Sequence, residues 1–403
     1  MGILKKIKKK IAAKISSIKT AQGFIEFYYK EDKKDFVSLA DDSFVRTEDT
    51  CKLIAFYLPQ YHSIPLNDQN FGRGFTEWDN VTKAKPQFVG HYQPQLPIDV
   101  GFYDLSHDNV MYRQVELAKQ YGVYGFCFHY YWFSGDRLLE KPIFNFLNNK
   151  ELDLPFCLCW ANENWSKLWD GGDRQVIKEQ KMDDDTYDMF YRDIKMFFND
   201  DRYIKINNKP LLVIYRAALF KKEKFINFLE GIRKEAMKDG FDGLFVITSN
   251  LQFDCTQADE WGLDGCVEFP PHGTFPHLTY KKGDYTNKNS TINRVDMHDY
   301  IKHKKFLIEN HKNTFKGVFP SWDNTARKTY SNGWCFEGVT PEAYESWLFE
   351  CIYDTRKNRE HQFVFINAWN EWGEGAHLEP DKKYGYAYLA ATRRALELSK
   401  QNN

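Results

Sequence analysis

The sequence predicts a single (β/α)8 barrel of the α/β class, and three observations lead to this fold class. Short apolar runs alternate with longer helix-like segments from Lys52 onward, an order that gives parallel strand pairing. Eight such runs occur, which favours closure into a barrel over an open doubly wound sheet. The chain of 403 residues is long enough for one barrel as a single domain. We predict the barrel over residues 51–400, after a short basic extension over residues 1–50.

Several of the predicted strands are apolar almost throughout, as expected when helices cover their outer face. The eight predicted strands span residues 53–59, 125–132, 155–162, 210–216, 244–250, 265–271, 316–323 and 362–370. Helices are predicted at residues 108–121, 139–149, 184–199, 221–239, 298–310, 341–357 and 384–399. One of them has a clear start, because Thr340 can cap it while Pro341 and Glu342 suit its first turn. The motifs GxGxxG and GxxxxGK[ST] do not follow the first strand, so nucleotide-binding folds lose support.

Composition excludes several classes of protein. The net charge of −1 gives no reason to expect nucleic acid as a partner. There is no run of about 18 apolar residues and no apolar signal core at the N-terminus, so neither a membrane span nor a secretory signal is expected. Most of the eight cysteines lie in apolar runs without CxxC pairs, which predicts reduced core cysteines in a cytoplasmic protein.

The N-terminal segment 1–20 combines isoleucines at helical spacing with many lysines. Two interpretations of this pattern stay open. A helix with one apolar stripe and a lysine-rich face would lie on the anionic inner surface of the cell membrane. A solvated basic tail would have the same composition. The isoleucines are Ile3, Ile7, Ile11, Ile15 and Ile18.

Polar and aromatic residues follow nearly every predicted strand, which core packing alone does not require. In a barrel the loops after the strands form the active face, so these residues are expected around one pocket. The aromatic fraction of 17% suits a sugar ligand, whose C–H faces pack on rings, although most rings are expected in the core. The candidates for substrate binding are Tyr57, Tyr61, His62, Trp78, His129, Tyr131, Trp160, Asn162, Glu163, Trp165, Tyr215, Asn250, Glu268, Trp322, Trp369, Asn370 and Trp372.

Each of these candidates also has a structural interpretation. Loop packing explains the cluster from Trp160 to Trp165 nearly as well as stacking on a sugar does. A lone histidine in a strand, such as His129, is more often a hydrogen-bonded structural group. Glu268 lies inside a predicted strand, where it would orient a catalytic group or form a buried ion pair. Glu379 is expected to be a structural brace.

The segment NAWNEWGEGAHLEP at 367–380 carries the sharpest signal. Glu371 and Glu374 stand three residues apart where the last strand turns into a loop, and Gly373 and Gly375 permit a tight turn. Glycosidic cleavage needs a proton donor for the leaving oxygen and a second carboxylate as base or nucleophile. Neighbouring carboxylates also raise each other's pKa, so that one can stay protonated near neutral pH. The alternative is that one or both bind backbone amides or cap a helix.

This segment closely resembles the NEWHEG…EP signature of the family-99 glycoside hydrolases, the endo-α-mannosidase and mannanase group. It is closer still to the WbsX-like proteins of bacterial surface-polysaccharide clusters, which are described as glycosyltransferases or as containing a family-99-like domain. The resemblance covers residues 53–395. Its other motifs are IAFYLPQYHSIPLND (54–68), GFTEWDNVTKAKPQFVGHYQPQLP (74–97), GVYGFCFHYYWFSG (122–135), PFCLCWANENW (155–165) and KPLLVIYR (209–216).

The resemblance implies a retaining mechanism without an enzyme nucleophile. The glutamate matching Glu371 acts as base on the sugar 2-hydroxyl, which attacks the anomeric carbon and gives a 1,2-anhydro sugar. The glutamate matching Glu374 protonates the leaving oxygen and later activates water. Because the nucleophile belongs to the substrate, such an enzyme supplies proton transfer and orientation. Gly373 departs from the hydrolase motif, which has histidine there, so the mannoside specificity is not carried over.

Three functions are consistent with the sequence. The first is a glycoside hydrolase acting on α-linked bonds of a surface polysaccharide such as O-antigen, capsule or lipopolysaccharide. The second is a glycosyltransferase in O-antigen or lipopolysaccharide biosynthesis that uses the same glutamates. The third is a non-catalytic carbohydrate-binding barrel. No cluster with metal-ligand spacing occurs and HEXXH is absent, and the proposed sugar chemistry needs no metal or other cofactor.

The enzymatic interpretation depends on where the carboxylates of Glu371 and Glu374 point. Both must face the cavity at the mouth of the barrel. A glutamate that points away from this cavity, is buried behind the last strand, or is held by an arginine would overturn the enzymatic interpretation.

Overall fold

The computed structural model describes residues 35–167, 175–182, 185–272, 280–281, 285, 290–307, 314–328 and 332–401, together with Lys9. The predicted membrane-surface segment 1–20 therefore lies outside the described residues, Lys9 apart. Within the described parts of the chain, none of the helices combines the length and the apolar character needed to cross a membrane.

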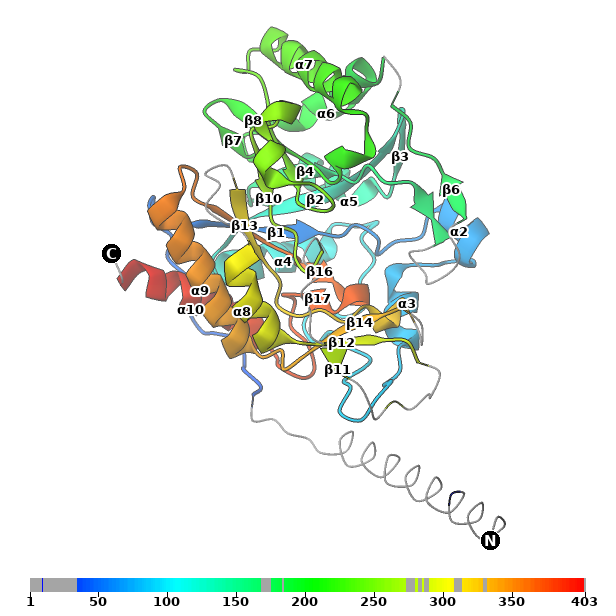
Figure 1. The fold of residues 1–403 in the computed structure, drawn as a ribbon, viewed down its shortest axis with the longest axis vertical. Helices are drawn as coiled ribbons and strands as arrows, with labels where there is room; N and C mark the ends of the chain where they lie inside the picture. The colour runs from blue at the N-terminus through cyan, green and yellow to red at the C-terminus, as the bar shows by residue number, and fades with distance from the viewer. Residues whose placement is uncertain are drawn as a thin grey trace.

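Eight parallel strands close into a barrel, as the sequence predicts (Figure 1). They are β1 (Lys52–Tyr57), β2 (Val123–Phe133), β4 (Phe156–Trp160), β8 (Lys209–Ile214), β9 (Phe245–Ser249), β10 (Gly265–Val267), β13 (Thr314–Val318) and β15 (Phe363–Ile366). Each strand pairs with the next one along the chain, and β1 pairs with both β2 and β15, which completes the ring. The strands are buried almost throughout, which explains their continuous apolar sequence.

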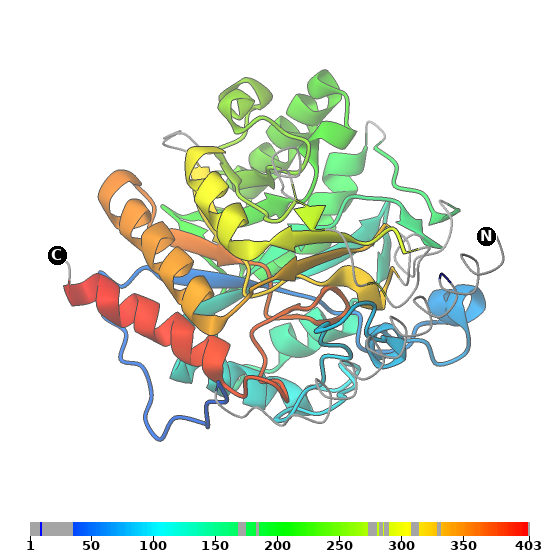
Figure 2. The same ribbon diagram turned by 60° about the horizontal axis from the view of Figure 1, so that its bottom comes forward.

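Helices cover the outside of the barrel. They are α4 (Asn109–Gln120), α5 (Lys141–Asn148), α6 (Thr186–Phe198), α7 (Lys222–Lys238), α8 (Met297–Leu307), α9 (Pro341–Asn358) and α10 (Ala387–Gln401). Each overlaps a predicted helix, and Thr340 caps α9 by accepting a hydrogen bond from the Ala343 backbone N–H at 3.2 Å. Helices α9 and α10, orange and red, lie side by side in Figures 1 and 2, while α6 and α7 pack together at another side.

Short elements that the sequence did not reveal lie in the connections between the barrel strands and helices. After β1 come α2 (Pro65–Phe71) and α3 (Glu77–Lys83). A small sheet joins β11 (Tyr280–Lys281), β12 (Asn293–Asp296) and β14 (Trp334–Glu337), and a hairpin joins β16 (Asn370–Glu371) to β17 (Ala376–His377). The remaining short elements are β3 (Asp136–Leu138), β5 (Trp165–Ser166), β6 (Val176–Lys178), β7 (Lys205–Ile206), η2 (Ala217–Leu219), η3 (Cys255–Gln257), η4 (Asp259–Trp261), η6 (Asn324–Ala326) and η7 (Trp372–Glu374).

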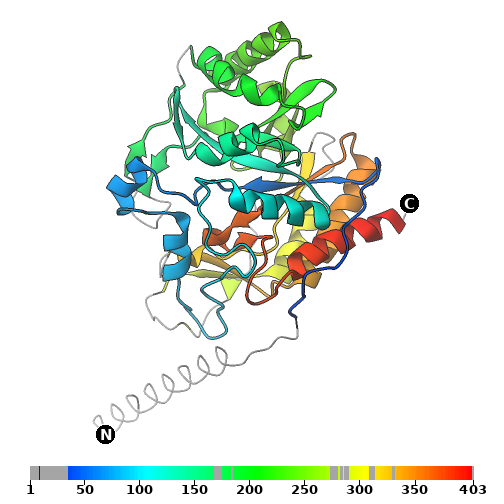
Figure 3. The same ribbon diagram turned by 180° about the vertical axis from the view of Figure 1, so that it is seen from behind.

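The described residues before β1 run along the barrel beside α10, as seen from behind in Figure 3. The backbone N–H of Val37 donates to the carbonyl of Tyr384 at 3.1 Å, and Arg393 forms an ion pair with Asp42 at 2.7 Å. Residues 35–50 are therefore attached to the barrel by both backbone and side-chain contacts.

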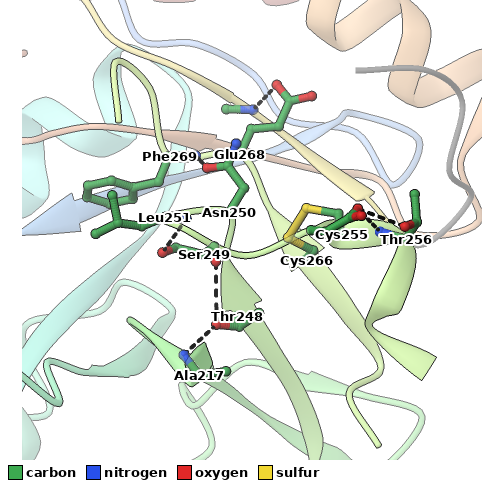
Figure 4. The surroundings of a disulfide bond; sticks show 12 residues. Ala217, Thr248, Ser249, Asn250, Leu251, Cys255, Thr256, Cys266, Glu268 and Phe269 are labelled. Carbon is green, nitrogen blue, oxygen red and sulfur yellow. Dashed lines mark hydrogen bonds between the residues drawn. A yellow bond between two sulfur atoms is a disulfide. The ribbon is translucent and has the colours of Figure 1, made fainter. Parts of the chain in front are cut away.

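Two of the cysteines are oxidised, so the prediction that all eight are reduced is wrong. Cys255 and Cys266 form a disulfide with their Cα atoms 5.4 Å apart (Figure 4). The pairing arises because the segment after β9 turns back along η3 and passes the beginning of β10, which sequence spacing does not reveal. The other six cysteines are free and buried. The cysteines therefore no longer argue for a cytoplasmic location.

Candidate active site

Two adjoining cavities lie at the carboxyl ends of the barrel strands. The smaller, which we call the inner pocket, has a volume of about 260 Å³, and the larger, the outer cleft, about 870 Å³. They share the side chains of Glu163, Asn164, His272, Arg327 and Glu374. The inner pocket is also lined by Leu58, Gln60, His129, Tyr131, Ala161, Trp165, Tyr215, Leu251, Phe269, Asn367 and Glu371. The inner pocket therefore draws residues from the loops of nearly every strand, as an active site on this fold does.

A tight turn after β15 presents Glu371 and Glu374 to these cavities. Glu371 ends β16, Glu374 ends the 3-10 turn η7, and Gly375 has the left-handed φ of 62° that allows the chain to turn into β17. The carbonyl of Glu374 accepts a hydrogen bond from the Asp323 backbone N–H at 2.7 Å, so the loop after β13 supports the turn. Glu371 lines the inner pocket, and Glu374 lines both cavities.

A buried arginine joins the two glutamates to a third carboxylate. The Nη2 atom of Arg327 lies 2.7 Å from Glu371, its Nη1 atom 2.8 Å from Glu374, and its Nε atom 2.7 Å from Glu77. The side chain of Arg327 is only 4% exposed and that of Glu77 only 2%. Water therefore screens these charges weakly.

Arg327 holds both glutamates, which is one of the arrangements expected to overturn an enzymatic role. Two observations nevertheless keep the pair as the candidate for catalysis. Both carboxylates face a cavity rather than the core. One guanidinium also balances only one of the three carboxylates, so the arginine orders the pair without cancelling its charge.

Burial dominates the proton affinity of this cluster. It raises the pKa of Glu371 well above its usual value, the negative charges of Glu374 and Glu77 raise it further, and Arg327 opposes the change. Burial likewise raises the pKa of Glu77 against the opposing effect of Arg327. The three carboxylates hold the pKa of the Arg327 guanidinium well above its usual value despite its burial. The cluster can therefore hold a proton at a pH where isolated carboxylates would be ionised.

Gly373 makes room for this ion-pair cluster. A Cβ atom at position 373 would lie 1.8 Å from Oε1 of Glu77 and 2.9 Å from Nε of Arg327. Glu77 is held from the other side by Asn80, which donates to the same oxygen at 3.3 Å. Any side chain at position 373, including the histidine of the NEWHEG signature, would displace the Glu77–Arg327 pair. The departure from the hydrolase motif is thus linked to the arginine cluster.

Seven of the predicted substrate-binding residues do line the two cavities. Tyr131 and Trp165 meet edge to face with ring centroids 5.1 Å apart, and the hydroxyl of Tyr131 accepts a hydrogen bond from Gln60 at 2.8 Å. Glu163 is held by an ion pair with Arg216. The seven residues are His129, Tyr131, Asn162, Glu163, Trp165, Tyr215 and Trp322.

The other predicted substrate-binding residues are not among the lining residues of either cavity. They are buried or use their polar atoms within the protein. Trp160 donates to the Trp132 carbonyl at 3.1 Å, and Glu268 accepts from Lys316 at 3.1 Å. The group comprises Tyr57, Tyr61, His62, Trp78, Trp160, Asn250, Glu268, Trp369, Asn370 and Trp372. We leave these residues out of the proposed site.

Glu379 ties the motif segment to the core behind the site. Its carboxylate accepts hydrogen bonds from Trp372 Nε1 at 2.7 Å, Gln114 at 2.7 Å, Tyr103 at 2.9 Å and Trp369 Nε1 at 3.2 Å. Burial raises the pKa of Glu379 to about 7, although these four donors oppose the change. The tryptophans of the motif thus support the turn from behind.

Among the described residues, one buried group combines three metal-binding side-chain types. The ligand atoms of His91, Asp323 and Cys335 all lie within 4.8 Å of one another. Nδ1 of His91 accepts from the Gln87 backbone N–H at 2.9 Å, so Nε2 carries a proton and donates to Asp323 at 2.7 Å. Asp323 also accepts from Thr325, and these contacts keep its pKa low although burial opposes this. We interpret the group as a hydrogen-bonded brace behind Glu374.

Comparison with known proteins places these features in a family. A family model described as glycosyltransferase WbsX matches residues 53–392. The chain belongs to this family. It is also 38% identical over 346 residues to the protein WxcX from two strains of Xanthomonas campestris pv. campestris, with 85% of this chain and 49% of each relative aligned. The chain thus spans about half the length of the curated relatives that it matches.

Solved structures confirm the fold that the motifs imply. The GH99 endo-alpha-mannosidase from Bacteroides thetaiotaomicron is similar with a TM-score of 0.54 at 13% identity, covering 88% of this chain and 99% of that one. A glycoside hydrolase-like protein gives a TM-score of 0.55 at 12% identity, covering 90% and 98%. At these identities the likeness establishes the fold. Family membership supports a carbohydrate-active protein, and the solved structures show that its barrel resembles that of a family-99 glycoside hydrolase.

Proposed function

We propose that this chain is an enzyme that cleaves or transfers α-linked glycosidic bonds of a bacterial surface polysaccharide such as O-antigen, capsule or lipopolysaccharide. The observation that supports this most strongly is the convergence of Glu371 and Glu374, from one tight turn, on the inner pocket. In this proposal the reacting sugar lies in the inner pocket, where Tyr131 and Trp165 offer aromatic surface to it. Saccharide is therefore the proposed partner.

The roles of the two glutamates follow from the cavities that they line. Glu371 faces only the inner pocket, so it is the proposed base for the 2-hydroxyl of the sugar that lies there. Glu374 faces both cavities, so it is the proposed acid for the oxygen that links this sugar to the next group. The 2-hydroxyl then forms its bond to the anomeric carbon as the bond to the leaving oxygen breaks, and a retaining outcome follows when the 1,2-anhydro sugar opens.

Arg327 belongs to the site in this mechanism. Its positive charge opposes the effect of burial on the pKa of Glu371 and so favours the ionised form, which can accept the proton of the 2-hydroxyl. Proton uptake by Glu371 also removes one negative charge from a cluster that carries more carboxylates than cations. The carboxylate of Glu374 must leave Arg327 when it contacts the leaving oxygen.

Hydrolysis and transfer differ only in the acceptor that opens the 1,2-anhydro sugar. The test is incubation with surface-glycan fragments of the host in ¹⁸O-labelled water, followed by mass analysis of the products. Hydrolysis places the label in a shortened product, and transfer gives a lengthened product without the label. Glu374→Gln is expected to abolish either product, whereas the exposed Glu48→Gln serves as the matched control and retains activity. Saccharide binding without any turnover by the wild type would instead indicate a carbohydrate-binding barrel.

We also propose that residues 1–20 contact the inner face of the cell membrane. The lysine-rich composition of this segment is the support for it. Deleting residues 1–20 is expected to move the protein from the membrane fraction to the soluble fraction. An unchanged distribution between the two fractions would overturn this proposal.

A further inference from the structure

The outer cleft carries more positive charge than the proposed acid–base chemistry requires. Of its described lining side chains, five are basic and two are acidic. The acidic ones are Glu163 and Glu374. The basic ones are Arg216, Lys221, Lys224, Arg327 and Lys328. Because the cleft is also large, a ligand several times the size of the inner pocket would meet this positive charge.

Two of these cations are available to a ligand. Arg327 and Arg216 are engaged with glutamates of the site. Lys221 and Lys328, in contrast, form no ion pair within the described part of the chain. The neighbouring Lys222, which does not line the cleft, is paired with Glu260 at 2.8 Å. The charges of Lys221 and Lys328 are therefore not balanced by ion pairs with the described residues.

The position of the lysines on α7 strengthens this point. Helix α7 begins at Lys222, Lys221 is its N-cap residue, and no side chain caps its first turn. A helix N-terminus carries partial positive charge and favours acidic or small polar residues, so Lys221 and Lys222 are unfavourable there, although Glu223 in the first turn offsets part of this charge. A bound anion would relieve both the charge repulsion and the unsatisfied N–H groups.

The glutamates define which part of a substrate would occupy the outer cleft. Glu371, the proposed base for the 2-hydroxyl, lines only the inner pocket, and Glu374, the proposed acid for the leaving oxygen, lines both cavities. The reacting sugar therefore belongs in the inner pocket, and the group linked to it belongs in the outer cleft. Trp334 and Phe220 add aromatic surface to that cleft.

We infer that the outer cleft binds an anionic group, a phosphate or a carboxylate, on the leaving or accepting part of the substrate. This inference rests on the proposed function of Glu371 and Glu374 for the direction of the substrate. The anion lies between Lys221 at the start of α7 and Lys328 in the loop after β13, beside Glu374. The substrate class is thus an acidic or phosphate-linked glycan rather than a neutral one.

Titration calorimetry with three probes tests the inference: inorganic pyrophosphate, trigalacturonate and neutral mannotriose. At least one anionic probe is expected to bind more tightly than mannotriose, and to weaken as NaCl rises from about 50 mM to about 300 mM. Lys221→Gln and Lys328→Gln are each expected to weaken anion binding about tenfold, the loss of one charge-assisted hydrogen bond. Preference for pyrophosphate or for trigalacturonate identifies phosphate or carboxylate as the group that the cleft takes.

Lys222→Gln is the matched control, because it removes the same charge one residue away on the side that does not line the cleft. It is expected to change anion affinity by less than about twofold. The inference is overturned if neither anionic probe binds, or if the Lys221→Gln/Lys328→Gln double variant binds them as the wild type does. Glutamate-dependent turnover with no such charge dependence would overturn the inference alone. Anion binding without glutamate-dependent turnover would overturn the proposed function alone.

Discussion

The two carboxylate sites of the segment 367–380 differ in what surrounds them. Glu379 points into the core, where four neutral hydrogen-bond donors satisfy its carboxylate. Glu371 and Glu374 point towards the cavities, where one guanidinium serves three carboxylates. The four donors hold the carboxyl group of Glu379 in one geometry, whether it is protonated or ionised. The cluster around the guanidinium leaves negative charge uncompensated at a cavity wall, which is what proton transfer to and from a ligand requires.

The segment 367–380 provides both structural support and the carboxylates proposed for the chemistry. Trp369 and Trp372, which the sequence suggested as stacking surfaces for sugar, donate their indole N–H groups to Glu379 instead. They are buried and hold the turn that presents Glu371 and Glu374. Changes on the core side of the motif should therefore act on stability, and changes on the cavity side on turnover.

Substitutions of the glutamates that face the cavities should have the largest effect on turnover and little effect on stability. Glu371→Gln and Glu374→Gln should each lower turnover of the host glycan by about 10² to 10⁴-fold, because each removes a proton-transfer group. Their thermal unfolding should stay close to that of the wild type. Steady-state kinetics and calorimetry check both parts. Turnover that survives in both variants would assign the chemistry elsewhere.

Glu379 should contribute a pH dependence to stability that the cavity glutamates do not explain. Its pKa is about 7 in the folded protein and 4.5 as an ordinary value, so the folded state favours the protonated form. The stabilising contribution is therefore complete below pH 4.5 and is lost as pH rises through about 7, amounting to about 3 kcal/mol.

Denaturant unfolding of the wild type and Glu379→Gln across this pH range measures the effect. The variant cannot titrate at this position. The unfolding free energy of the wild type should therefore fall relative to that of the variant as pH rises from about 4.5 to about 7. A difference that is independent of pH would mean that Glu379 has no raised pKa in the folded protein.

Arg327 should set the pH at which the site becomes active. Removing its charge in Arg327→Gln leaves burial and the neighbouring carboxylates to raise the pKa of Glu371 further. The rise in turnover with pH, which follows ionisation of Glu371, should therefore move upward by about one pH unit or more. The pH profile of kcat/KM measures this shift, and a profile that moves downward or stays in place would exclude Arg327 from the role proposed here.

A smaller effect, on stability, is expected when a side chain fills the space at Gly373. Gly373→Ala places a Cβ atom against Glu77 and Arg327, so it should disturb the cluster and lower stability. In a Glu77→Ala background the nearest clashing atom is gone. A double-mutant cycle of unfolding free energies should then give a coupling of about 1 kcal/mol between positions 77 and 373. Strict additivity would show that the two residues do not compete for this space.

The barrel was predictable because its signals are local. Each strand is an apolar run and each covering helix has a helical pattern, so all eight strands and the helices around them were found within a few residues. The turn at Glu371 was predictable because Gly375 and its neighbours mark it. The short elements of the connecting loops, such as α3 and β14, have no repeated place in the strand–helix alternation that reveals the barrel, so the sequence does not predict them.

The arginine cluster was not predictable, because its members lie far apart in the chain. Arg327 is 44 residues from Glu371 and 250 from Glu77, and neither distance leaves a pattern in the sequence. The direction of Trp369 and Trp372 was equally hidden, since a side chain at the end of a strand can face either the cavity or the core. The Cys255–Cys266 disulfide depends in the same way on a loop that folds back.

The most direct test is a structure of the Glu371→Gln/Glu374→Gln double variant with a bound glycan fragment of the host. We expect a sugar ring in the inner pocket, with side chain 374 within about 3.2 Å of the glycosidic oxygen and side chain 371 equally close to the 2-hydroxyl. Side chain 374 should then have left Arg327. A glycan bound away from the inner pocket, or side chains 371 and 374 that make no contact with it, would contradict the assignment of this pair to glycosidic chemistry.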